Sequence, residues 1–258
     1  MKSKFFLIIL SCLFSFGAFS NTITMDFNEH LNSIVSVDFP QSDYFPEVTN
    51  KTQVCLHHTA SGKGVKGDLS QFLKPGKIAT PIIVGHSEVY RLHSTRHWGY
   101  HLGIKKAVFK KYAIPYQNLN KTCIGLEIDN WGPLKLIDGE YRAWVNDFGE
   151  GDRKDRNGDS IKVVVDQANV ITYDEAFRGY QHYERYTEFQ IESVSWLLKY
   201  WADYHDIPLH YNSDMWDVSE NALKGSPGIY THVSYRSDKS DCHPQPELIE
   251  MLNKLNEC

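Results

Sequence analysis

Residues 52–60 read TQVCLHHTA, a short apolar run that ends in two histidines. The run predicts a strand over 52–57. A histidine at the end of a strand is held rigidly, as a zinc ligand must be, because its nitrogen has to lie about 2.0–2.1 Å from the ion in a tetrahedral array. Alone the pair is weak evidence, since the chain has 12 histidines. One core and one exposed histidine is the alternative interpretation.

More strand patterns follow this run. Residues 80–92 (TPIIVGHSEVYRL) predict a hairpin that turns near residues 85–87. Residues 122–128 (TCIGLEI) alternate between turn-forming segments, which predicts a third strand or strand pair. These patterns predict further strands after the histidine pair in the sequence.

Two helices are expected in the C-terminal half. A capping-box sequence from Thr187 to Gln190 predicts a helix start, and apolar residues then recur at helical spacing as far as Trp201. A last helix is expected after Pro244 and Pro246. The alternation of strands and helices predicts one α/β domain over 21–258, with helices packed on a central sheet.

The segment 135–186 differs, with short polar and aromatic pieces that predict an insertion beside the core. Aromatic residues are frequent at its end and in the sequence that follows. We expect them to pack in the core and in helix contacts rather than to stack on a sugar ring: Tyr180, Tyr183, Tyr186, Trp196, Trp201 and Trp216.

The N-terminus predicts export. Lys2 and Lys4 precede an apolar run, and small residues follow at 18–20, as in a secretory signal peptide over 1–20. The run is shorter than the roughly 20 residues of a membrane-spanning helix. A periplasmic or extracellular protein without an integral membrane segment is expected, with lipid anchoring at Cys12 as the alternative. The formal charge of −5 and the lack of a basic tract argue against nucleic acid as a partner.

Four cysteines remain after signal cleavage. Cys55 and Cys123 lie in predicted strands, so a buried pair, bonded or free, is expected, and Cys242 could pair with Cys258. Four cysteines allow three complete connectivities, and the sequence does not choose among them.

Partners for the first histidine lie far along the chain. His232 follows the short strand-like run 228–231, and Asp241 comes nine residues later. A loop of that length can return, so that both share one ion with His57. Two imidazoles and one carboxylate leave Zn²⁺ with a net charge of +1 and a fourth position for water, as in hydrolytic sites. Cys242 is an alternative sulfur donor, but consecutive side chains point to different sides, so only one of the two is expected to bind.

Five motifs in this order resemble one family. They are HHTA at 57–60, VYRL at 89–92, HWGYHLG at 97–103, IGLEIDN at 124–130, and His232 followed by KSD at 239–241. Together they resemble the zinc-dependent N-acetylmuramoyl-L-alanine amidases of the type-2 amidase family, related to amidase-type phage lysozymes and peptidoglycan recognition proteins. The resemblance covers most of 50–250 except the insertion. It implies a central mixed β-sheet flanked by helices.

The resemblance also implies roles for single residues. His57, His232 and Asp241 match the zinc ligands, and Lys239 matches the catalytic lysine. Further, Glu127 matches a proton-transferring glutamate, and His101 falls where relatives carry a histidine beside the substrate groove. This sequence departs from the pattern at Cys242-His243-Pro244, where many relatives have proline and glycine, and at Ala79-Thr80-Pro81, where some have a catalytic tyrosine.

The implied reaction is hydrolysis of the amide between N-acetylmuramic acid and L-alanine in peptidoglycan or muropeptides. Glu127 would move the proton and Lys239 would face the developing oxyanion. Each has an alternative: Glu127 as a solvent-facing strand residue, Lys239 as a surface lysine, His101 as a core histidine. Two other functions stay open, a non-catalytic peptidoglycan-binding module and a secreted wall-degrading effector with the same chemistry.

Overall fold

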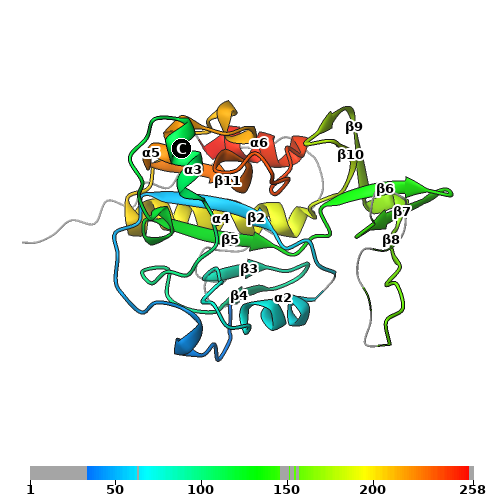
Figure 1. The fold of residues 1–258 in the computed structure, drawn as a ribbon, viewed down its shortest axis with the longest axis horizontal. Helices are drawn as coiled ribbons and strands as arrows, with labels where there is room; N and C mark the ends of the chain where they lie inside the picture. Colours follow the sequence, from blue (N-terminus) through cyan, green and yellow to red (C-terminus); the bar gives the residue numbers. More distant parts are fainter. Residues whose placement is uncertain (1–33, 63, 146–150, 152–153, 155–156, 256–258) are drawn as a thin grey trace, which may run out of the picture. The chain divides into compact units, whose positions relative to one another are not determined.

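A six-stranded mixed sheet forms the centre of the computed structural model, which describes residues 34–62, 64–145, 151, 154 and 157–255 (Figure 1). The predicted signal peptide, Cys12 and Cys258 lie outside these residues. The strand order is β1-β4-β3-β5-β2-β11. The strands are β1 (Val35–Ser36), β2 (Gln53–His58), β3 (Ile82–Val84), β4 (Val89–Arg91), β5 (Cys123–Ile128) and β11 (Gly228–Thr231).

Strand β2 lies between β5 and β11 and is parallel to both. All six of its residues are buried, which explains why its sequence is a continuous apolar run rather than an alternating one. Strands β3 and β4 form an antiparallel hairpin, and β3 is parallel to β5. The predicted strands at 52–57 and 122–128 and the predicted hairpin are confirmed.

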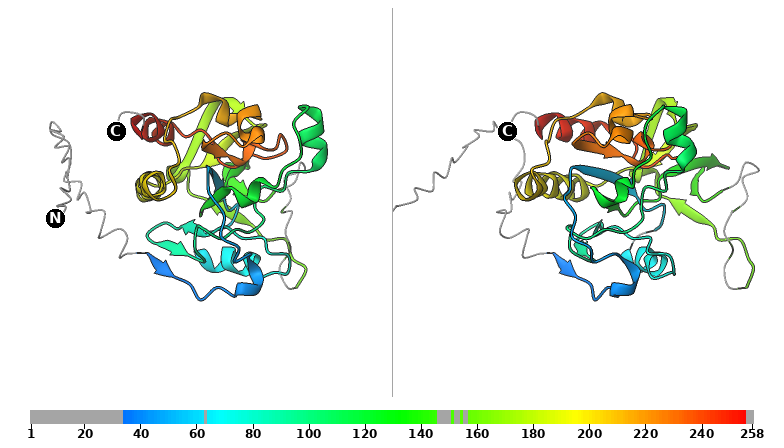
Figure 2. Two further views of the ribbon diagram at one scale, coloured as in Figure 1. Left: turned by 90° about the vertical axis from the view of Figure 1, so that its left-hand side faces the viewer. Right: turned by 60° about the vertical axis from the view of Figure 1, so that its left-hand side comes forward.

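Helices cover both sides of this sheet. Helices α4 and α6 lie on one side and α3 on the other (Figure 2). The helices are α2 (Val65–Phe72), α3 (Lys106–Lys111), α4 (Glu188–His205), α5 (Glu220–Lys224) and α6 (Pro246–Lys254). Short 3-10 turns are η1 (Gln41–Asp43), η2 (Leu119–Lys121), η3 (Gln167–Asn169), η4 (Ser213–Trp216) and η5 (His232–Ser234). The expected α/β class, a mixed sheet flanked by helices, is confirmed.

Both predicted helix starts are confirmed. Thr187 caps α4: its side chain accepts from the Gln190 amide, and the Gln190 side chain accepts from the Thr187 amide. Helix α6 begins at Pro246, which suits the first turn because proline lacks the N–H that would have no partner there. Its Leu248 and Leu252 are buried against the core.

A second, antiparallel sheet is built from residues 133–184, in the order β8-β7-β6-β10-β9. Its strands are β6 (Pro133–Ile137), β7 (Glu140–Ala143), β8 (Val163–Val165), β9 (Val170–Phe177) and β10 (Tyr180–Glu184). Leu134, Ala143 and Val165 form its small core. These strands were not predicted from the sequence, and the interpretation of the segment as an insertion stays a prediction.

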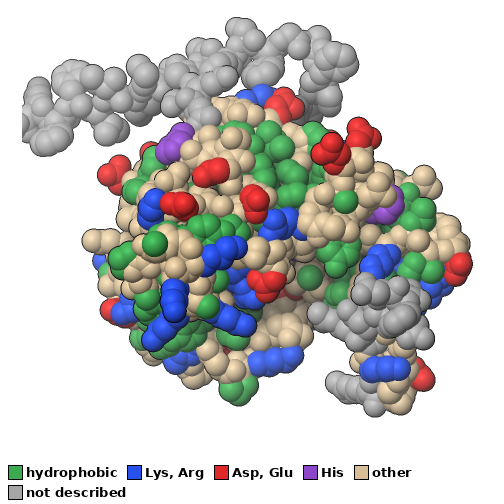
Figure 3. Space-filling model, turned by 45° about the horizontal axis from the view of Figure 1, so that its top comes forward, with side chains coloured by type: hydrophobic (Ala, Val, Ile, Leu, Met, Phe, Trp, Pro, Cys, Tyr) green, Lys and Arg blue, Asp and Glu red, His purple; other side chains and the backbone are tan. Residues whose placement is uncertain are grey.

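Cys55, Cys123 and Cys242 are buried free thiols in the described part of the chain. Acidic and basic side chains are interspersed on the face drawn in Figure 3. Among the described residues, no helix has the length and apolar character needed to cross a membrane.

Candidate metal centre

Two neighbouring parallel strands bring the first two candidate ligands together. Thr231, the last residue of β11, is the register partner of Leu56 on β2. His57 follows Leu56 within β2, and His232 follows Thr231 as the first residue of η5, so the two histidines lie side by side where β11 ends. The chain then returns to the two histidines at Asp241 through a loop. The Asp241 carbonyl closes this loop by accepting a hydrogen bond from the Val233 amide at 3.2 Å.

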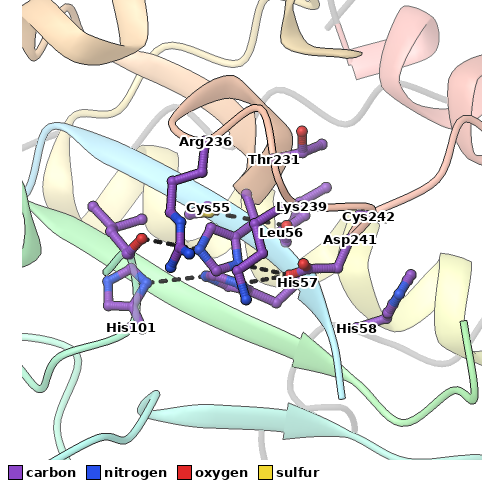
Figure 4. Close-up of polar contacts among 12 residues, drawn as sticks. Cys55, Leu56, His57, His58, His101, Thr231, Arg236, Lys239, Asp241 and Cys242 are labelled. Carbon is purple, nitrogen blue, oxygen red and sulfur yellow. Dashed lines mark hydrogen bonds and ion pairs between the residues drawn. The ribbon is translucent and has the colours of Figure 1, made fainter. Parts of the chain in front are cut away.

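The neighbouring histidines of β2 point apart. Side chains alternate along a strand, so His57 and His58 face opposite sides of the sheet. In Figure 4, His57 points toward Asp241, whereas His58 lies away from the cluster. The first histidine of the pair is therefore the one that can share an ion with Asp241.

Three ligand atoms converge at this edge. The Nδ1 atoms of His57 and His232 are 3.1 Å apart, and Oδ2 of Asp241 lies 3.0 Å from the first and 2.9 Å from the second. Two ligands about 2.0–2.1 Å from a zinc ion at the tetrahedral angle are about 3.3–3.4 Å apart. The triangle fits such an ion after a shift of a few tenths of an ångström.

The electrostatics of the triangle suit a cation. Burial lowers the pKa of His57 to about 4, and the neighbouring His232 adds to this effect, so His57 is a neutral imidazole near pH 7. Burial alone would raise the pKa of Asp241, but His232 and His57 beside it hold the pKa well below its usual value. A neutral imidazole and an ionised carboxylate are the forms that bind metal.

Hydrogen bonds on the far side of each ring fix the tautomers. His101 Nε2 lies 3.4 Å from the Cys123 carbonyl, which can only accept, so His101 Nδ1 is left to accept from His57 Nε2 at 3.0 Å. His232 Nε2 donates to the Leu102 carbonyl at 2.9 Å. The Nδ1 lone pairs of His57 and His232 are thereby directed at the shared point. Hydrogen-bond partners behind metal-binding histidines commonly orient the rings in this way.

His101 is therefore placed behind His57. It also lines the same cleft. Asn120 holds this segment, because its side-chain oxygen accepts from the amides of His101 and Leu102, both at 3.0 Å. The orienting contact with His57 was not predicted from the sequence, and the predicted contact with substrate stays a prediction.

A second potential donor set overlaps the first. Ligand atoms of Cys55, His57 and His101 also lie within 4.8 Å of one another. Burial raises the pKa of the Cys55 thiol well above its usual value, which disfavours the thiolate that zinc requires. The set with Asp241 is the better metal site.

Glu127 stands beside the first ligand. It is the register partner of His57 on strand β5. Its Oε2 is buried and makes no hydrogen bond with the residues that the structure describes. Burial raises the pKa of Glu127 well above its usual value, and the negative charges of Asp241 and Asp68 raise it further. A buried carboxyl with a free oxygen can exchange a proton with a bound molecule.

Lys239 lies in the loop between the second and third candidate ligands. Arg178, at the tip of the β9–β10 hairpin, donates to the carbonyls of Ser237 and Lys239 at 2.5 and 3.1 Å, which ties this loop to the second sheet. All predicted site residues line one cleft: His57, His101, Glu127, His232, Lys239 and Asp241.

The two departures from the family pattern have different surroundings. Cys242 is fully buried, and its thiol donates at 3.0 Å to the Tyr186 hydroxyl, which also contacts His58 and not His57. Ala79 and Thr80 are fully buried. Among the residues near this second departure, Ile78 lines the cleft.

The second sheet supplies a wall of the cleft that was not predicted from the sequence. Trp144 donates from Nε1 to the Ala60 carbonyl at 2.8 Å and packs edge-to-face on Trp131, with ring centroids 4.6 Å apart. Tyr180 lines the cleft as well as packing edge-to-face on the buried Tyr183, with ring centroids 6.3 Å apart, so its expected place in the core is only partly met. Tyr183 and Tyr186 are buried as expected. The aromatic density of 131–144 was the available signal.

The fold and the site together define an α/β protein with a candidate two-histidine, one-aspartate metal centre at the carboxyl edge of a mixed sheet. Sequence comparison matches no protein-family model and finds no similar curated protein.

Solved structures with a similar fold include the N-acetylmuramoyl-L-alanine amidase LysC from Clostridium intestinale, with 12% identity, a TM-score of 0.44, and 86% of this chain and 97% of that chain covered. The PlyG catalytic domain has 12% identity and a TM-score of 0.46, covering 87% and 93%. Hydrolase AmiA from Staphylococcus aureus has 11% identity and a TM-score of 0.42, covering 94% and 95%.

Proposed function

We propose that this protein is a zinc-dependent amidase that hydrolyses the bond between N-acetylmuramic acid and the L-alanine of peptidoglycan or its fragments. The observation that carries the proposal is the convergence of His57 Nδ1, His232 Nδ1 and Asp241 Oδ2 on one point. The buried carboxyl of Glu127 lines the same cleft. The choice of substrate rests on the five ordered sequence motifs.

The three ligands would hold Zn²⁺, which supplies polarisation of the scissile carbonyl and a water of lowered pKa. Glu127 accepts the proton of the attacking water and returns it to the leaving amine of L-alanine. Burial raises the pKa of Glu127, which makes its carboxylate a stronger base for the first step.

Lys239 stabilises the transition state in this proposal. It lines the cleft together with the ligands, and its ammonium group would face the oxygen on which negative charge develops. One well-placed donor of this kind contributes roughly 3–4 kcal/mol in comparable sites. Burial keeps the His57 ring neutral, and His101 accepts its Nε2 proton in a hydrogen bond, which leaves the Nδ1 lone pair for the ion.

The proposal includes export to the periplasm or the cell exterior, where peptidoglycan is found. It rests on the signal-peptide pattern of residues 1–20. A non-catalytic binding module is disfavoured, because all three candidate ligands are present and converge. A wall-degrading effector would share the same chemistry and differ in its target.

Mass spectrometry of digested sacculi tests the reaction. New free L-alanine N-termini on stem peptides, absent after treatment with the Glu127→Gln variant, are the expected products. New reducing sugar ends, or cleaved peptide crosslinks with intact lactyl amides, would overturn the proposal.

A further inference from the structure

Tyr186 joins the two chain segments that carry the first and third candidate ligands. It lies between β10 and α4, and its side chain is buried. Its hydroxyl is 3.1 Å from His58 Nδ1, 3.0 Å from the Cys242 sulfur and 3.1 Å from the His243 amide nitrogen. His58 follows His57, and Cys242 follows Asp241.

The donors and acceptors around this hydroxyl are complementary. The His243 amide can only donate, and the Cys242 thiol donates as well, so these two occupy both lone pairs of the hydroxyl. The single hydroxyl proton is then given to His58 Nδ1. Tyr186 therefore makes every hydrogen bond that a hydroxyl can make.

The main chain of Tyr186 is fixed to the same region. Its amide donates to Gln245 Oε1 at 2.7 Å, and Gln245 Nε2 donates to its carbonyl at 3.1 Å. The His243 ring also stacks on the Tyr186 ring, with centroids 4.3 Å apart. Tyr186 and the segment after Asp241 thus form one rigid unit.

We infer that Tyr186 is a positioning residue of the metal centre. Its hydroxyl holds the Cys242 thiol on the far side of the chain, so that Asp241 and not Cys242 reaches the ion, and it fixes the distance between the segments that carry His57 and Asp241. This inference rests on the proposed zinc centre.

The Tyr186→Phe variant tests the inference, because it removes the hydroxyl and keeps the ring. Zn²⁺ affinity is measured by competition with a chromophoric chelator, which needs no activity. We expect binding to weaken about 10–100-fold, the usual effect of losing an outer-shell partner. Tyr173→Phe is the matched control: it removes a hydroxyl 2.7 Å from His243 Nδ1 that contacts neither His58 nor Cys242. We expect its affinity to stay within about threefold of the wild type.

Cobalt substitution of the wild type gives a second measurement that does not depend on how a variant folds. Carboxylate and imidazole ligation gives no sulfur-to-metal charge-transfer band. A strong band that is lost in the Cys242→Ser variant would show that Cys242 binds and would overturn the inference, and a band that remains in that variant would come from another cysteine and would overturn the proposed centre as well. Equal zinc affinity of Tyr186→Phe and wild type would overturn it as well and leave the proposed function intact. A wild type that binds neither metal would overturn both.

Discussion

His57 and Glu127 are register partners on the adjacent parallel strands β2 and β5. Their relative position is set by the hydrogen-bond ladder of a buried sheet and not by loops. A metal ligand and a proton-transferring group must be held in place to within a fraction of an ångström. Strands of a buried sheet hold side chains more precisely than loops do.

Glu127→Gln separates proton transfer from metal binding. The amide has nearly the same shape but cannot accept a proton, so turnover should fall about 10²–10⁴-fold while the zinc content stays at the wild-type level. Muropeptide turnover and metal analysis of the same sample measure this. Glu250→Gln, on the exposed face of α6, is the control with unchanged turnover. Retention of full activity by Glu127→Gln would assign the proton transfer elsewhere.

His232→Ala should lose both zinc and activity. Two ligands cannot hold the ion as three do, and the Nδ1 of His57 and Oδ2 of Asp241 would remain 3.0 Å apart without their third partner. Zinc per chain is measured after dialysis against a weak chelator. His210→Ala removes an exposed histidine and should keep its zinc. A zinc-replete His232→Ala variant would contradict the ligand assignment.

Lys239→Ala should lower kcat about 10²–10³-fold, because the variant lacks the cation that stabilises the oxyanion. The zinc content should not change. Lys224→Ala removes an equal charge from the exposed surface of α5, at a residue that does not line the cleft, and should leave kcat unchanged. If both variants behave alike, the role of Lys239 is not specific.

Asp68→Asn tests the cost of a buried carboxylate. Burial raises the pKa of Asp68 to about 7, and the charge of Asp129 adds to this, while the hydrogen bond from Ser61 opposes it. The pKa of this carboxyl is higher in the folded state than in the unfolded state, where it is about 4. The protein therefore loses stability as the pH rises from about 4 to about 7, because the unfolded state gives up its proton first.

The Asn variant carries no such charge, so its unfolding free energy relative to wild type should increase by about 1–3 kcal/mol between pH 4.5 and pH 8. Urea unfolding of the metal-free proteins at the two pH values measures it. A difference that does not change with pH would show that Asp68 is ionised in the folded protein throughout this range.

The central sheet was predictable because its strands carry strong local signals. The apolar run that ends at His57 and the hairpin around Gly85 need no distant information. The site itself was predictable only through the order of its motifs, since spacing alone cannot show that His232 and Asp241 return to β2. The capping box at Thr187 is local, and the structure has it as expected.

The second sheet was not predictable in the same way. Its strands are short, and its core of Leu134, Ala143 and Val165 is too small to leave a clear periodic pattern. Tyr186 contacts His58, which is 128 positions away in the sequence, and Cys242, which is 56 positions away. Such pairings depend on the packed structure, so the orienting roles of Tyr186 and His101 were missed.

Metal content measured together with activity tests the central claim most directly. Purified protein without the signal peptide is assayed on sacculi before chelation, after chelation, and after Zn²⁺ is added back. We predict about one zinc per chain, no release of stem peptides from the chelated protein, and recovery on adding Zn²⁺. Full activity in the metal-free protein would contradict the account.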